Sequence, residues 1–248
     1  MMQGLVTIDF GNSHPHAGLF QKIQNTWSLI KVVPWTELSL FLNQLQMTAE
    51  NSTMVLCEVK AREEALTPLL QQGYLITRVK DYWRGQRFAG MPVNYAHSLG
   101  EDRLIQAFFV FKNFKKRSLL IDAGTFTTMD VITNRGFEGG YIFPQLENYL
   151  STFQKGDLLK NVPIGLNISS VLPQGTAEAM RDSYFAYAAL AQKIVLEHQI
   201  DQIIITGGQS SLWKQVFELL KLNATVQEES HLIHLALQFW MTTQIETL

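Results

Sequence analysis

Short apolar runs rich in β-branched residues recur in the first third of the chain, and each is bounded by polar or turn-forming residues. The runs are LVTIDF at 5–10, TMVLCEV at 53–59 and YLITRV at 74–79. Runs of this length and composition predict buried strands. Between the last two runs, residues 61–73 are mostly helix formers and end at Gly73, a residue type that commonly follows a helix. The pattern therefore predicts the order strand, helix, strand.

A longer helical pattern starts at Gly100. Apolar residues recur there at intervals of three and four, which places them on one face of a helix. They are Leu104, Ala107, Phe108 and Phe111. The basic segment KNFKKR at 112–117 follows, where cations are favourable because the helix dipole is negative at its end. We interpret this segment as a solvent-exposed helix end rather than a nucleic-acid-binding patch.

The pattern of the first half is then repeated. The segment 118–132 predicts strand, turn and strand, as the segment 4–20 does. In both, an aspartate, a glycine and small polar residues follow the first apolar run. These are Asp9, Gly11, Asn12 and Ser13 in the first segment and Asp122, Gly124 and Thr125 in the second. A further glycine turn ends the apolar run IIITGG at 203–208 and precedes a predicted helix. The repeat predicts an α/β fold with two similar lobes, residues 1–116 and 117–248, around one cleft.

The bulk composition is that of a folded globular protein. Hydrophobic residues make up 46% of the 248 residues and charged residues 17%, which excludes a disordered composition. The formal net charge of -2 gives no field that would hold nucleic acid or an anionic membrane. No run approaches the ~18 apolar residues of a membrane span, the N-terminus has no cationic signal region, and the single Cys57 cannot form an internal disulfide. We therefore expect a soluble cytoplasmic protein without nucleic-acid or membrane partners.

The segment DFGNS at 9–13 has the residue types of a phosphate-binding turn. A carboxylate at a strand end can hold a hydrated divalent cation, while glycine lets backbone N–H groups approach phosphate oxygens. Gly11 would permit the tight turn, and Asn12 and Ser13 would donate hydrogen bonds to phosphate. Taken alone, however, the motif equally describes an ordinary turn at the end of a strand.

The segment DAGTFTT at 122–128 favours the phosphate-binding interpretation. It repeats the carboxylate, glycine and hydroxyl of the first turn, so two hairpins would supply phosphate donors. Thr125 would place a hydroxyl close to a cation held by Asp122. Together, the two segments predict a phosphate clamp.

The segment LGEDR at 99–103 lies at the start of the predicted amphipathic helix. A helix N-terminus favours anions, so Arg103 and nearby amides could bind a substrate carboxylate while Asp102 accepts a hydroxyl proton. The residues alone favour a different interpretation, a helix-capping acid with a surface ion pair, because acidic first turns are common.

Two histidine pairs carry less information. His14 and His16 lie beside the first turn, but two histidines without a third ligand indicate a turn rather than a metal site. His231 and His234 share a predicted helix face with apolar neighbours, which indicates the edge of a core.

Six motifs, in their order and spacing, resemble the type III pantothenate kinase family. They are DFGNS, YAHSLGEDR, DAGTFTTMDV, GFEGGYIFP, PQGTAEAM and IIITGG, and they extend from Asp9 to Gly208. The resemblance implies two ribonuclease-H-like lobes of the acetate and sugar kinase, heat-shock ATPase and actin superfamily. It also implies ATP-dependent phosphorylation of pantothenate, the first step of coenzyme A synthesis.

The resemblance assigns roles to individual residues. Asp102 would be the catalytic base, Asp122 would bind a monovalent cation such as K⁺ or NH₄⁺, and Asp9 would hold Mg²⁺ through water. The ATP-phosphate contacts would be Asp9, Phe10, Gly11, Asn12, Ser13, His14, Pro15, His16 and Thr125. The substrate contacts would be Tyr95, Gly100, Glu101, Asp102, Arg103 and Thr176. In the family, the threonine that matches Thr176 belongs to the partner subunit. The resemblance therefore implies a homodimer.

The chain departs from the family pattern in two places. Gln145 stands where the family has the last glycine of Gly-Gly-x-Ile-x-Pro-Gly. Gly175 replaces the usual Asn before Thr176, and Glu178 and Met180 replace small residues after it. These changes leave two alternatives open: a non-catalytic regulatory protein on the same fold, and a related kinase with another acceptor. The phosphate and base positions are intact, which favours an enzyme.

Overall fold

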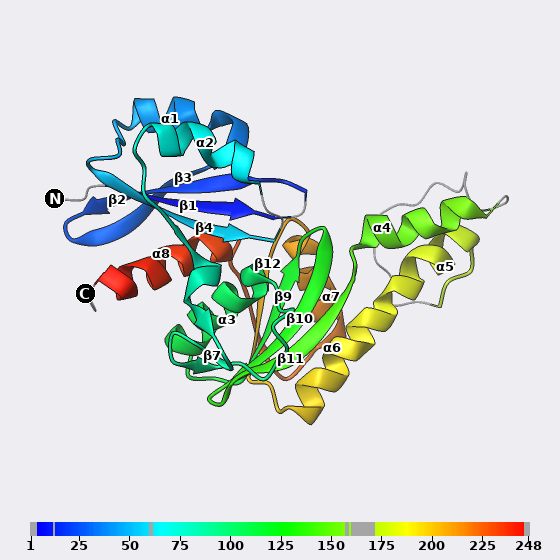
Figure 1. Ribbon diagram of the computed structural model, residues 1–248. Helices are drawn as coiled ribbons and strands as arrows, with labels where there is room; N and C mark the ends of the chain where they lie inside the picture. The colour runs from blue at the N-terminus through cyan, green and yellow to red at the C-terminus, as the bar shows by residue number, and fades with distance from the viewer. Residues whose placement is uncertain (1–3, 12, 60–61, 157–158, 160–171, 246–248) are drawn as a thin grey trace. The chain divides into compact units, whose positions relative to one another are not determined.

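The computed structural model describes residues 4–11, 13–59, 62–156, 159 and 172–245, which form two compact units (Figure 1). The first unit comprises residues 1–113, 135–137 and 231–248 of the chain, and the second comprises 114–134 and 138–230. The first unit is therefore completed by the last helix in the sequence. No helix within the described ranges is long and apolar enough to cross a membrane.

The first unit is built on a sheet with the strand order β3-β2-β1-β4-β5. Its strands are β1 (Gly4–Phe10), β2 (His16–Ile23), β3 (Thr26–Pro34), β4 (Ser52–Glu58) and β5 (Ile76–Arg78). A small sheet adds β6 (Trp83–Arg84), β7 (Arg87–Phe88) and β8 (Met91–Pro92). The helices are η1 (Trp35–Glu37), α1 (Leu38–Gln44), α2 (Glu63–Gln71), η2 (Val79–Tyr82), α3 (Glu101–Asn113) and α8 (Leu232–Ile245).

The alternation of side chains along β1 places helices on both faces of this sheet. Val6, Ile8 and Phe10 point to one face, where they form a buried cluster with residues of α1 and α2. Thr7 and Asp9 point to the opposite face. There α8 contacts β1, β4 and α3, and Figure 1 shows α1 and α2 on one side of the sheet and α8 on the other.

The second unit repeats the five-stranded arrangement with the order β11-β10-β9-β12-β13. Its strands are β9 (Ser118–Ala123), β10 (Phe126–Thr133), β11 (Gly136–Pro144), whose first two residues belong to the first unit, β12 (Gln202–Thr206) and β13 (Thr225–Glu228). Its helices are α4 (Leu146–Ser151), η3 (Thr152–Lys155), α5 (Thr176–Asp182), η4 (Ser183–Phe185), α6 (Ala186–Glu197) and α7 (Ser210–Leu220).

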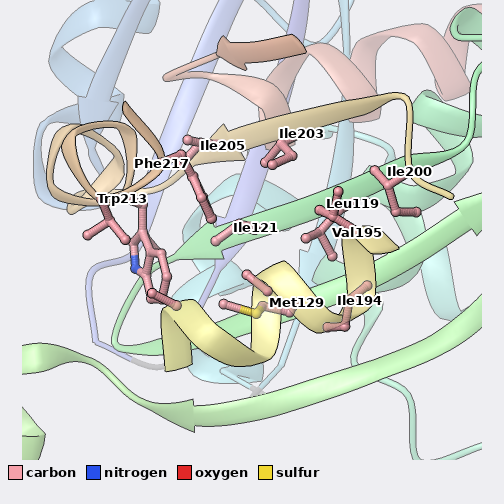
Figure 2. Close-up of a cluster of buried hydrophobic side chains, with 14 of the residues drawn as sticks. Leu119, Ile121, Met129, Ile194, Val195, Ile200, Ile203, Ile205, Trp213 and Phe217 are labelled. Atoms are coloured by element: carbon pink, nitrogen blue, oxygen red, sulfur yellow. The ribbon is translucent and has the colours of Figure 1, made fainter. Parts of the chain in front are cut away.

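The core of the second unit lies between its sheet and the helices α6 and α7, as Figure 2 shows. The alternate residues Leu119 and Ile121 of β9 and Ile203 and Ile205 of β12 point into this core, and all four are fully buried. Apolar side chains of α6 and α7 pack against them. These include Ile194, Val195, Trp213 and Phe217.

Both sheets have the same connectivity around their central strand. β1 pairs antiparallel with β2 and parallel with β4, and β9 pairs antiparallel with β10 and parallel with β12. The predicted α/β fold with two similar units is thus confirmed. The predicted strand at 74–79 is too long, since β5 covers only Ile76–Arg78. Before β5, the Tyr74 hydroxyl donates to the Met47 carbonyl at 2.7 Å. After β5, Val79 starts a 3₁₀ turn.

Candidate active site

The first candidate half-site lies where β1 and β4 end together. These parallel strands pair Asp9 with Cys57 and Phe10 with Glu58, and the Val59 N–H donates to the Phe10 carbonyl at 3.1 Å. Asp9 is 9% exposed, because it lies on the face of the sheet that α3 and α8 cover. The carboxylate therefore stands at the carboxyl edge of the sheet, as the sequence predicts.

The predicted phosphate turn follows Asp9 directly. Gly11 is partly buried and Ser13 is exposed, while Asn12 lies outside the described residues. A Cβ atom at Gly11 would lie 3.6 Å from Asp9 Oδ2, an ordinary van der Waals distance, and Gly11 is not among the positive-φ residues. The turn geometry therefore does not itself require glycine at this position. A ligand that approaches the backbone closely would require it.

Asp102 lies at the start of α3 in the same unit. Its Oδ1 accepts the Arg103 backbone N–H at 2.8 Å. A Cβ atom on Gly100 would overlap that same carboxylate oxygen, so any other residue here would require the Asp102 side chain to move. Burial raises the pKa of Asp102, and the backbone N–H and charge of Arg103 offset part of that rise. A carboxylate with a raised pKa at a helix N-terminus is a stronger base than an exposed one.

Arg103 is held by aromatic rings. Its guanidinium carbon lies 5.2 Å from the centre of the Tyr95 ring and 5.7 Å from that of Phe137, and Arg103 as a whole is 5% exposed. The structure thus places Arg103 beside the Tyr95 ring and directly after Asp102 in α3. A guanidinium beside aromatic rings keeps its charge.

The buried thiol of Cys57 lies near both Asp9 and Asp102, the two carboxylates of this half-site. Burial raises the pKa of the Cys57 thiol well above its ordinary value, and four neighbouring carboxylates raise it further. They belong to Asp9, Asp102, Glu101 and Glu58. Asp9 and Asp102 are far apart in the sequence, yet both lie close enough to this thiol to act on its charge.

Glu58 forms an ionic cluster with Arg78 and Lys80 and is tied to Glu101, and sequence reasoning missed this cluster. The Glu58 side chain is 3% exposed and pairs with Arg78 at 2.8 Å and with Lys80. Glu101 Oε2 accepts the Glu58 backbone N–H at 3.3 Å, which ties the start of α3 to the end of β4. Glu58 directly follows a buried apolar run, and that position at a strand end was the available signal.

Glu101 should make the stability of the protein depend on pH. Burial raises its pKa from the ordinary value of 4.5 to about 7, and the charge of Glu58 acts in the same direction, while backbone N–H groups and Lys80 oppose the rise. The folded state therefore binds this proton more tightly than the unfolded state. The contribution of Glu101 to stability is therefore fully present below pH 4.5 and is lost as the pH rises through about 7.

The variant Glu101→Gln keeps an acceptor for the Glu58 N–H but cannot ionise. We expect its melting temperature to exceed that of the wild type at pH 8 and to approach it at pH 4. Each kcal/mol gained in the free energy of unfolding raises the melting temperature by about 2 to 4 °C. Thermal denaturation across this pH range measures the effect. A difference in melting temperature that does not change with pH would contradict it.

The second candidate half-site belongs to the second unit and surrounds the end of β9. Asp122 pairs with Thr206 of β12, and the turn after β12 packs against the β9 turn. A Cβ atom on Gly207, which has φ +88, would meet the Ala123 backbone at 2.6 Å and Asp122 Oδ1 at 2.7 Å. Glycine is therefore required there. The Gln209 N–H donates to the Ala123 carbonyl at 3.0 Å, and α7 begins at the next residue.

Thr125 follows Asp122 in the β9–β10 turn and is partly buried. Its carbonyl accepts the Asn148 side-chain amide at 3.0 Å, so the turn is anchored near the start of α4. This half-site thus contains a carboxylate, a threonine and the N-terminus of α7. These are the groups that a phosphate and a cation require.

The departures from the family pattern cause no strain in the structure. Gln145 precedes α4 with φ -62 and ψ 165, an extended conformation that any residue adopts, and its amide donates to Glu147 at 3.3 Å. Thr176 is the exposed first residue of α5. Glu178 accepts the Gln174 N–H at 3.3 Å and so caps the start of that helix.

The four histidines lie in different environments. His14 is exposed, while His16 Nε2 lies 3.5 Å from Asp9 Oδ2. His231 is exposed, but the prediction that His234 lies at the edge of the core is wrong, since it is 1% exposed. Sequence reasoning missed this buried histidine because its neighbours are distant in the sequence.

No group of three or more His, Cys, Asp or Glu side chains could hold a metal ion within the part of the chain that the structure describes. Mg²⁺ with a nucleotide usually takes one or two carboxylates, with water and phosphate oxygens as its other ligands. The single buried carboxylate of Asp9 fits that manner of binding. Asp122 fits a cation in the same way in the second unit.

Solved structures of other proteins have the same fold as this chain. A conserved putative Baf family transcriptional activator from Campylobacter jejuni is 18% identical, with a TM-score of 0.61 over 97% of this chain and 99% of that chain. A putative 2-dehydro-3-deoxygalactonokinase from Sinorhizobium meliloti is 13% identical, with a TM-score of 0.57 over 98% and 100% of the two chains. Both likenesses extend over nearly the whole of this chain, so they show that it shares its fold with these proteins.

The family follows from sequence comparison. The family profile described as type III pantothenate kinase matches residues 5–197. A type III pantothenate kinase from Geobacter sulfurreducens is 26% identical over 229 residues, which cover 84% of this chain and 88% of that protein. This chain belongs to the type III pantothenate kinase family. The predicted ATP-dependent phosphorylation of pantothenate in coenzyme A biosynthesis is thereby confirmed.

Proposed function

We propose that Asp102 is the general base with which this chain phosphorylates pantothenate. One observation carries the proposal: Asp102 follows Glu101, whose carboxylate accepts the Glu58 backbone N–H at the end of β4, and that end of β4 pairs with the end of β1 at Asp9. A base and a nucleotide-binding carboxylate in this arrangement suit phosphoryl transfer to a hydroxyl, in which positioning and electrostatics supply most of the catalysis.

In the proposed reaction, the primary hydroxyl oxygen of pantothenate attacks the γ-phosphorus of ATP. The bond to the β–γ bridging oxygen breaks, ADP leaves, and Asp102 accepts the hydroxyl proton. Arg103, stacked on Tyr95, binds the pantothenate carboxylate, and Gly100 leaves room for the Asp102 side chain.

The nucleotide contacts of the proposal lie in both units. Backbone N–H groups of the turn after Asp9 and the Ser13 hydroxyl bind phosphate oxygens in the first unit. Asp9 holds Mg²⁺ through water, and this ion neutralises phosphate charge when it is bound. In the second unit we assign an ATP contact to Thr125 and a monovalent cation to Asp122.

A coupled assay of ADP release tests the proposed function. The purified chain should release ADP only when both ATP and pantothenate are present, and faster in KCl than in NaCl. ADP release with another hydroxy acid but not with pantothenate would favour a related kinase. Binding of ATP by calorimetry without any turnover would favour a regulatory protein.

We propose further that the working unit is a homodimer in which Thr176 reaches the partner's pantothenate site. The exposed position of Thr176 at the start of α5 supports the proposal. If each site combines Asp102 of one subunit with Thr176 of the other, a heterodimer of Asp102→Asn and Thr176→Ala chains has one intact site. Two inactive variants should therefore regain about one quarter of wild-type turnover after random subunit exchange.

The matched control replaces the Thr176→Ala chain by a chain that carries both substitutions. Its heterodimer with Asp102→Asn has no intact site, so it should stay inactive. Subunit exchange must be demonstrated in both mixtures. No recovery in the first mixture despite exchange, or a chain that sediments only as a monomer at assay concentration, would overturn the shared site.

A further inference from the structure

A buried histidine of α8 lies behind the proposed nucleotide site of the first unit. His234 is 1% exposed and packs against the face of the sheet where Thr7 of β1 pairs with Gly18 of β2. A Cβ atom on Gly18 would lie 2.8 Å from the His234 ring and 2.6 Å from Thr7 Oγ1. The ring therefore fits only because residue 18 has no side chain. None of the proposed catalytic steps uses this histidine.

His234 belongs to a line of polar contacts that ends at Asp9. Its Nδ1 lies 2.7 Å from Thr7 Oγ1, and its Nε2 lies 2.9 Å from His16 Nδ1. The other nitrogen of His16, Nε2, lies 3.5 Å from Asp9 Oδ2. This last distance is long for a hydrogen bond, but contacts of catalytic groups are often long before the substrate binds.

The chemistry of the partners sets the direction of these contacts. A carboxylate only accepts, so His16 must carry its proton on Nε2 to interact favourably with Asp9. In a neutral His16, Nδ1 is then an acceptor, which requires His234 to donate from Nε2. His234 Nδ1 consequently accepts the Thr7 hydroxyl proton. When Thr7 donates to His234, His234 donates to His16 and His16 donates to Asp9, both imidazole rings are neutral.

The opposite direction is unfavourable. It would need the Thr7 hydroxyl to donate to the Gly18 carbonyl, which lies farther away at 3.2 Å. His16 would then face the carboxylate with a bare nitrogen unless it took up a second proton. Burial lowers the pKa of His234, and the nearby His16 and His231 lower it further. A neutral His234 ring is therefore favoured, in agreement with the first direction.

We infer that His234 and His16 are positioning residues that orient the Asp9 carboxylate from the C-terminal helix. The inference rests on the proposed role of Asp9 in holding the cation of the nucleotide. A ring that donates to a metal-binding carboxylate restricts its rotation and leaves its other oxygen for the cation or its water. Through this contact, α8 sets the affinity of the first unit for Mg²⁺-nucleotide but not for pantothenate.

The ring protonation can be measured on the wild-type protein alone. Nitrogen-15 NMR of the imidazole groups should show His234 and His16 with a proton on Nε2 and a bare Nδ1. A proton on Nδ1 of His234 would overturn the inference. This measurement needs no variant, so it stands even where a substitution prevents folding.

Substitution tests the consequence for the nucleotide. His234→Leu should raise the KM for MgATP roughly 10-fold, the lower end of the usual effect of residues behind metal ligands, and leave the KM for pantothenate unchanged. His234→Gln, which retains a donor, should recover part of the loss. The control His231→Leu changes an exposed histidine of the same region and should leave both constants unchanged.

Calorimetry provides a readout apart from turnover. His234→Leu should weaken binding of MgADP and leave binding of ADP in EDTA unchanged. Equal losses in both titrations, or no loss in either, would overturn the positioning role. Asp9→Asn, measured in parallel, separates the two proposals: if it leaves MgADP binding intact, the role of Asp9 fails. If it weakens binding and His234→Leu does not, only the histidine inference fails.

Discussion

Asp102→Asn is expected to lower kcat for pantothenate phosphorylation by about 10²- to 10⁴-fold, the usual effect of removing a general base. The amide keeps the shape of the side chain and can still accept the Arg103 backbone N–H, which lies 2.8 Å from Oδ1 in the wild type. It cannot take up the hydroxyl proton. Because the lost interaction forms in the transition state, kcat and kcat/KM should fall together.

Steady-state kinetics at saturating ATP, with ATP affinity measured by calorimetry, test this result. ATP affinity should stay within about twofold of the wild type, since the substitution does not touch the phosphate turn. Asp81→Asn offers a matched control, because it makes the same chemical change at an exposed position in the same unit. Near-normal turnover of Asp102→Asn would remove the residue from its proposed role.

Asp9→Asn is expected to lower kcat/KM for MgATP by roughly 100-fold, because one negative charge that holds the cation is lost. The KM for pantothenate should not change. A titration of free Mg²⁺ at fixed ATP should show half-maximal activity at a higher metal concentration than in the wild type. This shift distinguishes lost cation binding from a general loss of structure.

The same control, Asp81→Asn, should leave the Mg²⁺ titration unchanged. Excess Mg²⁺ should restore part of the activity of Asp9→Asn but none of that of Asp102→Asn. An Asp9→Asn variant that alters only the pantothenate KM would place the residue in the acceptor site instead. A variant with an unchanged Mg²⁺ titration would exclude the proposed cation contact.

Local sequence patterns predicted the central strands and the turns that follow them. β1, β4, β9 and β12 are wholly or largely buried, so apolar β-branched runs identify them, and the residues after each run must lie at a sheet edge. The helix α3 was equally visible from its apolar spacing. Asp9, Asp102 and Asp122 were therefore placed correctly in their elements.

The contacts between distant segments could not be read in this way. Apolar spacing places His234 on a helix, but its burial depends on Gly18 and Thr7, which lie on β strands more than two hundred residues earlier in the sequence. The ionic partners of Glu58 lie on β5 and η2, and no periodicity relates them. Tertiary packing decides such contacts, and the small sheet β6-β7-β8 was missed because its strands have only two residues each.

The position of α8 in the first unit imposes an order on biosynthesis. Ala236, Leu237 and Trp240 of this helix are fully buried, and the Trp240 ring stacks on Phe88 at 5.8 Å. A ribosome makes these residues only after the whole second unit. The nascent first unit must therefore keep one apolar face of its sheet uncovered while the second unit is being made. The first lobe to be translated is the last to be completed.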